Sequence, residues 1–207
     1  MSKVKVRLGI KVKVRLGIVA VQGAFVEHRR VFERLGAECV EIRNARLLDE
    51  CDGLVLPGGE STTQGKLARE LSLFEPVRAA ILRGVPTFAT CAGLILLAER
   101  IVDDSARYFA TIPCVARRNA FGRQNASFTT ALDVRGIGAF PCVFIRAPYL
   151  ESVGKDVEIL ATYCDRVVGV RYRNQWGFAF HPELTDDDRL ASQYLADVVS
   201  YAARIRS

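Results

Sequence analysis

The sequence predicts a three-layer α/β fold in which helices flank a mainly parallel central sheet. In the first hundred residues, short apolar runs typical of buried strands alternate with segments whose apolar residues recur at helical spacing. This alternation is the pattern of βαβ units, which build parallel sheets. Residues 108–170 differ, because they contain short β-type runs and no long helical stripe. They predict additional, antiparallel strands.

Local signals define the individual elements. Residues Leu16–Val21 are apolar and predict a buried strand, and Phe25–Leu35 carries a helical apolar stripe that Gly36 is placed to end. Further elements are predicted as strands at 38–42, 53–56, 85–90 and 177–180 and as helices at about 61–71, 75–82, 92–100 and 186–205. Thr185 is the expected cap of the last helix.

The 207 residues suit one domain with a sizeable core. The segment KVKVRLGI occurs twice in succession, at residues 3–10 and 11–18, and only the second copy continues into the first predicted strand. We therefore expect residues 1–10 to be a dispensable extension and residues 11–207 to form a single domain. One copy carries half of the formal net charge of +6. Without an aromatic-rich basic stretch, that charge does not indicate nucleic-acid binding.

Several classes of protein are disfavoured by composition. No apolar run has membrane-spanning length, and the charged, alternating start is unlike a secretion signal, so a cytoplasmic protein is expected. None of the six cysteines forms a C-x-x-C pair, which argues against a zinc or thioredoxin-like site. We predict neither a metal nor a cofactor. Five cysteines are expected to be buried free thiols, and Cys91 is the exception.

Cys91 lies between a predicted strand and a predicted helix, within Phe88-Ala-Thr-Cys-Ala-Gly93. Small neighbours allow a sharp turn from which the thiol projects, as in a nucleophile elbow. A following helix would favour the thiolate through its dipole. Ala89 stands where such elbows usually have glycine. When this segment is considered alone, a buried structural cysteine at a strand end is a fair alternative.

His181 is the predicted base for this thiol. The only other histidine, His28, lies beside two arginines on a predicted helix and is expected on a solvated face. Glu183 follows His181 by two residues, and in extended chain such side chains point to the same side. Glu183 would then orient the imidazole while His181 serves Cys91, which is the logic of a catalytic triad.

A glycine-containing loop follows another predicted strand, in Leu56-Pro-Gly-Gly-Glu-Ser-Thr-Thr63. Gly58 and Gly59 permit close approach of the backbone to a ligand, and peptide N–H groups there are candidates to stabilise an oxyanion. The alternative is a tight loop capped by Ser61. A phosphate loop is disfavoured because Lys66 is not at the required spacing.

These segments together resemble the class I glutamine amidotransferases, and within them the glutaminase subunits of pyridoxal 5′-phosphate synthase. The resemblance covers roughly residues 15–204. It rests on Val21-Gln-Gly-Ala-Phe25, Leu56-Pro-Gly-Gly-Glu-Ser-Thr-Thr63, Thr90-Cys-Ala-Gly-Leu94, Arg118-Asn-Ala-Phe-Gly-Arg-Gln124, Phe144-Ile-Arg-Ala-Pro148 and Phe180-His-Pro-Glu-Leu-Thr185. The segments at 118–124 and 144–148 discriminate this family from the wider superfamily. The departures are Ala89, Arg117 in place of an acidic residue, a weak match at 103–114 and the doubled N-terminus.

The resemblance implies a flavodoxin-like fold and a set of site residues. The implied triad is Cys91, His181 and Glu183. The implied glutamine contacts are Gly59, Glu60, Ser61, Arg118, Ile145 and Arg146, where arginine suits the α-carboxylate and Glu60 suits the α-amino group. The N–H groups of Gly59 and Ala92 are the candidates for the oxyanion hole.

The implied reaction is hydrolysis of L-glutamine to glutamate and ammonia through a γ-glutamyl thioester. By the same resemblance, ammonia passes through a tunnel to a synthase subunit that makes pyridoxal 5′-phosphate from a pentose phosphate and a triose phosphate. The glutaminase would be weak until that partner docks. Two alternatives stay open: the glutaminase subunit of histidine or purine synthesis, and a non-catalytic regulatory relative.

Overall fold

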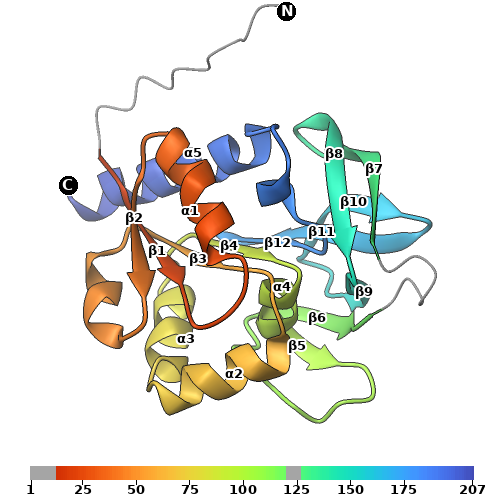
Figure 1. The fold of residues 1–207 in the computed structure, drawn as a ribbon, viewed down its shortest axis with the longest axis horizontal. Coiled ribbons are helices and arrows are strands. Elements are labelled where there is room, and N and C mark those ends of the chain that lie inside the picture. The colour runs from red at the N-terminus through yellow and green to blue at the C-terminus, as the bar shows by residue number, and fades with distance from the viewer. Residues whose placement is uncertain (1–12, 120–126) are drawn as a thin grey trace, which may run out of the picture.

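The computed structural model describes residues 13–119 and 127–207. Within them, ten strands form one sheet in the order β2-β1-β3-β4-β12-β11-β9-β6-β5, with β10 paired to β11 (Figure 1). The strands are β1 (Arg15–Val19), β2 (Glu38–Ile42), β3 (Gly53–Leu56), β4 (Thr87–Thr90), β5 (Ala98–Ile101), β6 (Ile112–Arg117), β9 (Tyr149–Val153), β10 (Glu158–Tyr163), β11 (Arg166–Tyr172) and β12 (Gln175–Phe178). A separate hairpin is formed by β7 (Ser127–Val134) and β8 (Gly138–Ile145).

The sheet has a parallel and an antiparallel part. Strands β2, β1, β3, β4 and β12 are parallel to one another. From β12 onward, β11, β9 and β6 pair antiparallel, and β10 pairs antiparallel with β11. Strands β3 and β4 are buried at every residue, which explains why neither contains a charged side chain. The predicted α/β fold with additional antiparallel strands is confirmed.

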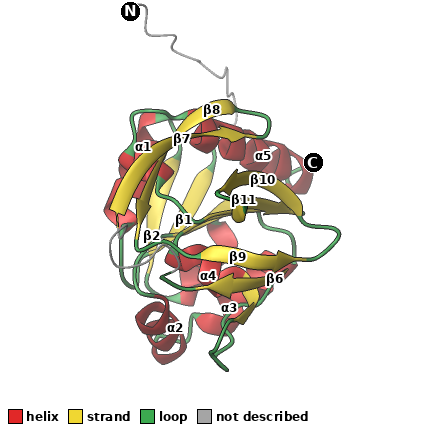
Figure 2. Cartoon of the chain, turned by 90° about the vertical axis from the view of Figure 1, so that its right-hand side faces the viewer, coloured by secondary structure: helices red, strands yellow, loops and turns green. Residues whose placement is uncertain are grey.

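Helices cover both faces of the parallel part (Figure 1, Figure 2). The helices are α1 (Phe25–Arg34), α2 (Ser61–Glu70), α3 (Phe74–Leu82), α4 (Ala92–Leu97) and α5 (Arg189–Ile205), with short 3-10 turns η1 (Ala45–Glu50) and η2 (Pro182–Leu184). Helices α1 and α5 lie on one face, and α2, α3 and α4 lie on the other. Tyr194 of α5 packs against Phe32 of α1 and Phe88 of β4, and its hydroxyl donates to the Leu54 carbonyl oxygen at 2.8 Å.

Two predicted helices are shorter than expected. The helix after Cys91 ends at Leu97 instead of about residue 100, because residues 98–101 pair with β6 as strand β5. Sheet pairing overrides the helix propensity of this apolar run. The last helix begins at Arg189, since the Thr185 hydroxyl bonds to the Pro182 carbonyl oxygen and thereby stabilises the preceding turn. Thr185 is therefore not the cap of α5.

All six cysteines are free thiols, as predicted, but the expected burial is only partly correct. Cys51, Cys114 and Cys142 are buried, whereas Cys39 is half-buried and Cys164 is exposed. Burial raises the pKa of the Cys51, Cys114 and Cys142 thiols to about 12. These three groups are protonated at neutral pH and have the character of core side chains.

The predicted extension at residues 1–10 lies outside the described residues, so the domain boundary stays a prediction. Across residues 13–119 and 127–207, no helix combines the length and the apolar character needed to span a bilayer.

Candidate functional site

Four loops meet at the carboxyl edge of the parallel strands. The loop of Gln22 and Gly23 follows β1, that of Gly58 and Gly59 follows β3, Cys91 follows β4, and the segment leading to His181 follows β12. Because β1, β3, β4 and β12 are sheet neighbours with the same direction, these loops are adjacent in space. The candidate site therefore lies where ligands bind in open α/β sheets.

Cys91 occupies a strained turn between β4 and α4. Its φ of 48° and ψ of −104° are unusual for a residue with a side chain. The turn is held by a 2.7 Å hydrogen bond from the Cys91 N–H to the Phe178 carbonyl oxygen. A Cβ on Gly93 would lie 2.1 Å from the Leu56 carbonyl oxygen, so α4 can start here only with glycine at that position. The geometry is that of the predicted elbow.

Ala89, the departure from the elbow pattern, fits regular sheet pairing. It lies in register with Gly177 of β12 on one side and with Leu56 of β3 on the other, and it is fully buried. Its methyl group therefore projects from the sheet into the buried interior, two residues before the strained turn.

His181 and Glu183 lie beside Cys91. The Nδ1 of His181 is 2.7 Å from Oε1 of Glu183, and both side chains are almost fully buried. The contact forms as predicted, but through the 3-10 turn η2 rather than through an extended chain. The backbone N–H of His181 donates to the Val143 carbonyl oxygen of β8 at 2.8 Å, which ties the turn to the hairpin.

The electrostatics favour a charged imidazole next to a carboxylate. Burial alone lowers the pKa of His181, but its hydrogen bonds with Cys91 and Glu183 outweigh burial and raise that pKa to about 10. Burial likewise opposes ionisation of Glu183, yet the neighbouring His28 and His181 hold the pKa of this carboxyl below its usual range. At neutral pH, His181 carries a proton that it can deliver.

The prediction for His28 is wrong, since its side chain is 1% exposed. Its Nε2 lies 2.9 Å from the Thr90 hydroxyl oxygen and 3.4 Å from Oε1 of Glu183. The flanking arginines suggested a solvated face, but His28 is three residues after Phe25 and four before Phe32, on the apolar stripe. That spacing was the signal that would have placed it in the interior.

Gly58 and Gly59 form a loop that is fixed by several neighbours. The Gly58 N–H donates to the Thr90 hydroxyl at 3.0 Å, and the Gly58 carbonyl oxygen accepts from the Ala24 N–H at 3.0 Å. A Cβ on Gly58 would lie 2.5 Å from His181 Cε1, and one on Gly59 would lie 2.4 Å from Gln22 Oε1. Close packing against the imidazole requires glycine at position 58, whereas a Cβ on Gly59 would first meet the flexible ends of two glutamine side chains. The loop lies directly against the imidazole.

Glu60 has a structural role at the start of α2. Its carboxylate accepts from the N–H groups of Thr62 and Thr63 at 3.0 and 2.7 Å, and its own N–H donates to Gln22 Oε1 at 2.8 Å. Glu60, rather than Ser61, is the helix cap. Ser61 is the first residue of the helix and is buried.

The predicted contact residues surround one cavity of about 500 Å³. Its lining includes Gly59, Glu60, Ser61, Cys91, Arg118, Asn119, Ile145, Arg146 and His181, together with residues of the loop after β1. The Cys91 thiol lies 3.9 Å from the Ile145 carbonyl oxygen at the end of β8. Ala92, the second candidate for the oxyanion hole, is the first residue of α4 and directly follows the thiol. The cavity lining thus brings together all of the predicted glutamine contacts with Cys91 and His181, whereas Ala92 is not part of that lining and Asn119 was not predicted.

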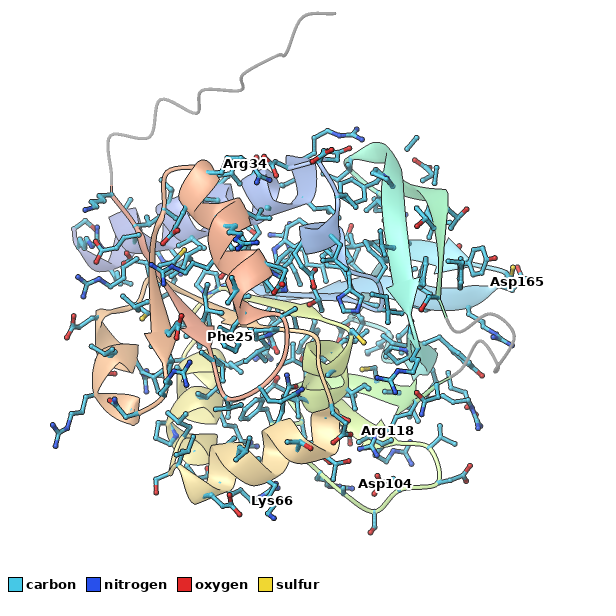
Figure 3. All side chains as sticks on the ribbon, in the orientation of Figure 1. Phe25, Arg34, Lys66, Asp104, Arg118 and Asp165 are labelled. Atoms are coloured by element: carbon cyan, nitrogen blue, oxygen red, sulfur yellow. The ribbon has the colours of Figure 1, made fainter. Side chains whose placement is uncertain are left out.

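Arg118 is held in place by groups that were not predicted. Its guanidinium contacts the carboxylate of Asp104 at 2.9 Å, and both residues are labelled in Figure 3. The guanidinium also donates to the Tyr108 hydroxyl at 3.2 Å. Its Nε is buried, and within the described residues it has no hydrogen-bond partner. The segment 120–126, which completes the predicted motif that starts at Arg118, lies outside the described residues.

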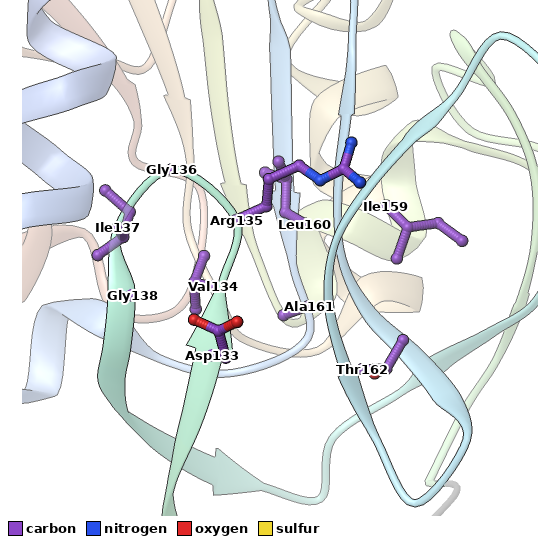
Figure 4. Close-up of a pocket in the computed structure, with 10 residues that line it drawn as sticks. All are labelled: Asp133, Val134, Arg135, Gly136, Ile137, Gly138, Ile159, Leu160, Ala161 and Thr162. Carbon is purple, nitrogen blue, oxygen red and sulfur yellow. The ribbon is translucent and has the colours of Figure 1, made fainter.

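A second hollow of about 510 Å³ lies between the β7–β8 turn and β10, lined by residues 133–138 and 159–162 (Figure 4). Its charged lining side chains are Asp133 and Arg135, and it holds no cysteine or histidine. In the described part of the chain, no group of three or more His, Cys, Asp or Glu side chains is arranged to hold a metal ion. The cavity next to Cys91 is therefore the candidate active site.

Comparison with known proteins shows the family to which the chain is related. The model of the SNO glutamine amidotransferase family matches residues 18–200. Pyridoxal 5′-phosphate synthase subunit PdxT of Desulfitobacterium hafniense is 56% identical over 185 residues, which cover 89% of this chain and 93% of the relative. The subunit of the same name from Streptococcus pneumoniae is 49% identical, and that match covers 87% of this chain and 95% of the relative.

Solved structures extend the comparison. A crystal structure of a glutamine amidotransferase superposes with a TM-score of 0.85 at 43% identity, covering 89% of this chain and 98% of that one. The structure of PurLQS from Thermotoga maritima has a TM-score of 0.63 at 17% identity, covers 95% of this chain and all of that one, and shares the fold alone. By its matched sequence and its fold, the chain belongs to the SNO glutamine amidotransferase family.

Proposed function

We propose that the protein hydrolyses L-glutamine to glutamate and ammonia and supplies the ammonia to a pyridoxal 5′-phosphate synthase subunit. The main support is the contact of Cys91, His181 and Glu183 beside a cavity large enough for an amino acid. Relatives that are 49% and 56% identical are named as subunits of that synthase. Family membership supports glutamine as the substrate, and the cavity beside Cys91 is the proposed location of its hydrolysis.

In the proposed reaction, the Cys91 thiolate attacks the side-chain amide carbon of glutamine. His181 gives its proton to the amide nitrogen, the carbon–nitrogen bond breaks, and ammonia leaves a γ-glutamyl thioester. Neutral His181 then takes a proton from water, which attacks the thioester and releases glutamate and the thiolate. The raised pKa of His181 supports its role as the initial acid. Glu183 orients the ring and stabilises its charge throughout.

The remaining cavity residues are assigned by their chemistry. Arg118 and Arg146 suit the α-carboxylate of glutamine. The buried Nε of Arg118 has no hydrogen-bond partner among residues 13–119 and 127–207, which supports a role as donor to that carboxylate. Glu60 suits the α-amino group, although its carboxylate already caps α2. Gly59, Ser61 and Ile145 complete the contacts, and the N–H groups of Gly59 and Ala92 are the proposed oxyanion donors.

The test is glutamine hydrolysis measured with and without a pyridoxal 5′-phosphate synthase subunit. The proposal predicts weak or no turnover alone, strong turnover with the synthase, and pyridoxal 5′-phosphate formed from glutamine, a pentose phosphate and a triose phosphate. Synthase subunits of histidine and purine synthesis serve as matched controls. Equal activation by one of those subunits would reassign the pathway, and no turnover with any of them would favour a non-catalytic subunit.

A further inference from the structure

His28 occupies a position that the proposed triad chemistry does not use. It lies on α1, is 1% exposed, and packs between Phe32, at a ring-centroid distance of 6.4 Å, and Phe88, at 6.1 Å. A buried imidazole among aromatic rings is costly unless its polar atoms are satisfied. The oxygen atoms that face its Nε2 belong to Thr90 and Glu183.

Burial determines the charge of His28, and the hydrogen-bond geometry determines which ring nitrogen carries the proton. Burial lowers the pKa of this imidazole, although the Glu183 charge opposes that shift, so the ring is neutral at pH 7. Its Nε2 faces two oxygens, the Thr90 hydroxyl at 2.9 Å and the Glu183 carboxylate at 3.4 Å. A bare ring nitrogen would repel the carboxylate. The proton therefore resides on Nε2, which donates to Thr90 and stabilises the charge of Glu183.

Thr90 connects this imidazole to the loop after β3. Its hydroxyl oxygen accepts from His28 and also from the Gly58 N–H at 3.0 Å. Gly58 in turn packs on the ring of His181, which is bonded to Glu183. These pairwise contacts form a closed ring of neighbouring residues. It runs from Glu183 through His28, Thr90, Gly58 and His181 back to Glu183. Cys91 directly follows Thr90, and a Cβ on Gly58 would lie 3.4 Å from the Cys91 Cβ.

We infer that His28 is a positioning residue, which fixes the Glu183 carboxylate and, through Thr90, couples it to the Gly58 loop. In this role the ring transfers no proton and does not touch the substrate. It keeps Glu183 aligned with His181 and keeps the loop seated against the imidazole. The expected effect on kcat rests on the proposed function, because it requires glutamine hydrolysis. The expected effect on alkylation of Cys91 does not require that function.

The first test replaces His28 in the full-length protein, assayed with the synthase partner. His28→Phe keeps an aromatic ring of similar size and removes the donor. It is expected to lower kcat about 10- to 100-fold with little change in KM, as for loss of a hydrogen bond to a charged group. His28→Gln, which can place an amide N–H near the position of Nε2, is expected to restore much of that loss. Val31→Ala, one turn away on the same buried face, is the control that loosens α1 without removing the donor.

The second test needs no glutamine. Alkylation of Cys91 by iodoacetamide at pH 7, followed by mass spectrometry of the Cys91 peptide, reports how well His181 stabilises the thiolate. His28→Phe is expected to slow this alkylation several-fold, and Val31→Ala is expected to leave it unchanged. In a Glu183→Gln background, His28→Phe is expected to add little, because the two residues act as one unit.

Thr90 supplies variants that preserve shape should His28→Phe not fold. Thr90→Val replaces the hydroxyl by a methyl group and is expected to lower kcat and alkylation in the same way, while Thr90→Ser retains both. Wild-type kcat and alkylation in Thr90→Val or His28→Phe would overturn the inference, as would an equal loss in Val31→Ala. If the wild type showed no glutaminase activity but His28→Phe still slowed alkylation of Cys91, the proposed function would be refuted and the positioning role supported.

Discussion

A methyl group on Gly58 would lie 2.5 Å from Cε1 of His181 and 3.1 Å from its Nδ1. This separation is too short for carbon atoms, so the loop and the imidazole must move apart if Gly58 gains a side chain. Gly58→Ala is therefore expected to lower kcat about 100-fold, because small displacements of reacting groups are costly. The measurement is steady-state glutamine hydrolysis with the synthase partner.

Gly154→Ala is the control for that variant. Its added Cβ would lie 3.1 Å from the Pro113 carbonyl oxygen, at a site remote from Cys91, and a shift of a few tenths of an ångström relieves it. We expect near-normal kcat for Gly154→Ala. Equal activity of the two variants would mean that the loop does not need to be seated against His181.

Glu183→Gln tests the carboxylate that orients His181. The amide keeps the shape but loses the charge, so the pKa of His181 is expected to fall from about 10 toward its ordinary range. The titration can be followed by NMR of the imidazole. The kcat is expected to fall by about 10³ to 10⁴, as when the carboxylate of a catalytic triad is replaced by an amide. An unchanged His181 titration would contradict the assigned pairing.

Arg118 and Arg117 form a matched pair for substrate binding. Arg118 lines the cavity, whereas Arg117 bonds to Glu151 at 2.7 Å and is absent from the cavity lining. Arg118→Ala is expected to raise KM for glutamine about tenfold or more through loss of a charge-assisted contact to the α-carboxylate. Arg117→Ala is expected to leave KM unchanged. The reverse result would place the carboxylate elsewhere.

The stability of the protein should depend on His28 at mildly acidic pH. Burial lowers the pKa of His28 in the folded state, although the Glu183 charge opposes this, whereas the unfolded chain takes up the proton near pH 6.5. The unfolded state then binds more protons, so the stability contributed by neutral His28 is present above about pH 6.5 and is lost as the pH falls.

The measurement is the free energy of urea unfolding of wild type and His28→Phe between pH 5 and 7.5. The wild type is expected to lose stability relative to the variant as the pH decreases across this range. Parallel curves for the two proteins would show that His28 titrates alike in the folded and unfolded states.

The fold and most of the site follow from local sequence patterns. Alternating strands and helices predicted the parallel sheet, and Cys91, His181 and Gly58 were each expected after a strand. The structure adds that these strand ends share one edge of the sheet. These features depend on residues close together in the chain. The contact of His181 with Glu183 was predicted as well, although a 3-10 turn forms it instead of an extended strand.

What the sequence did not reveal depends on residues far apart in the chain. His28 is bonded to Thr90, 62 residues away, and α4 ends early because residues 98–101 pair with β6. The partners that hold Arg118 come from the segment in which the family pattern is weakest. Local periodicity carries no information about such pairings.

Replacement of Cys91 tests the central claim most directly. Cys91→Ala should form no glutamate or ammonia from glutamine with the synthase partner present. Cys164→Ala, which removes an exposed thiol, should match the wild type. Pyridoxal 5′-phosphate synthesis by the complex with Cys91→Ala should persist when ammonium salt replaces glutamine, because the partner is unaltered. Glutamine hydrolysis by Cys91→Ala at the wild-type rate would contradict the assignment of Cys91 as the nucleophile.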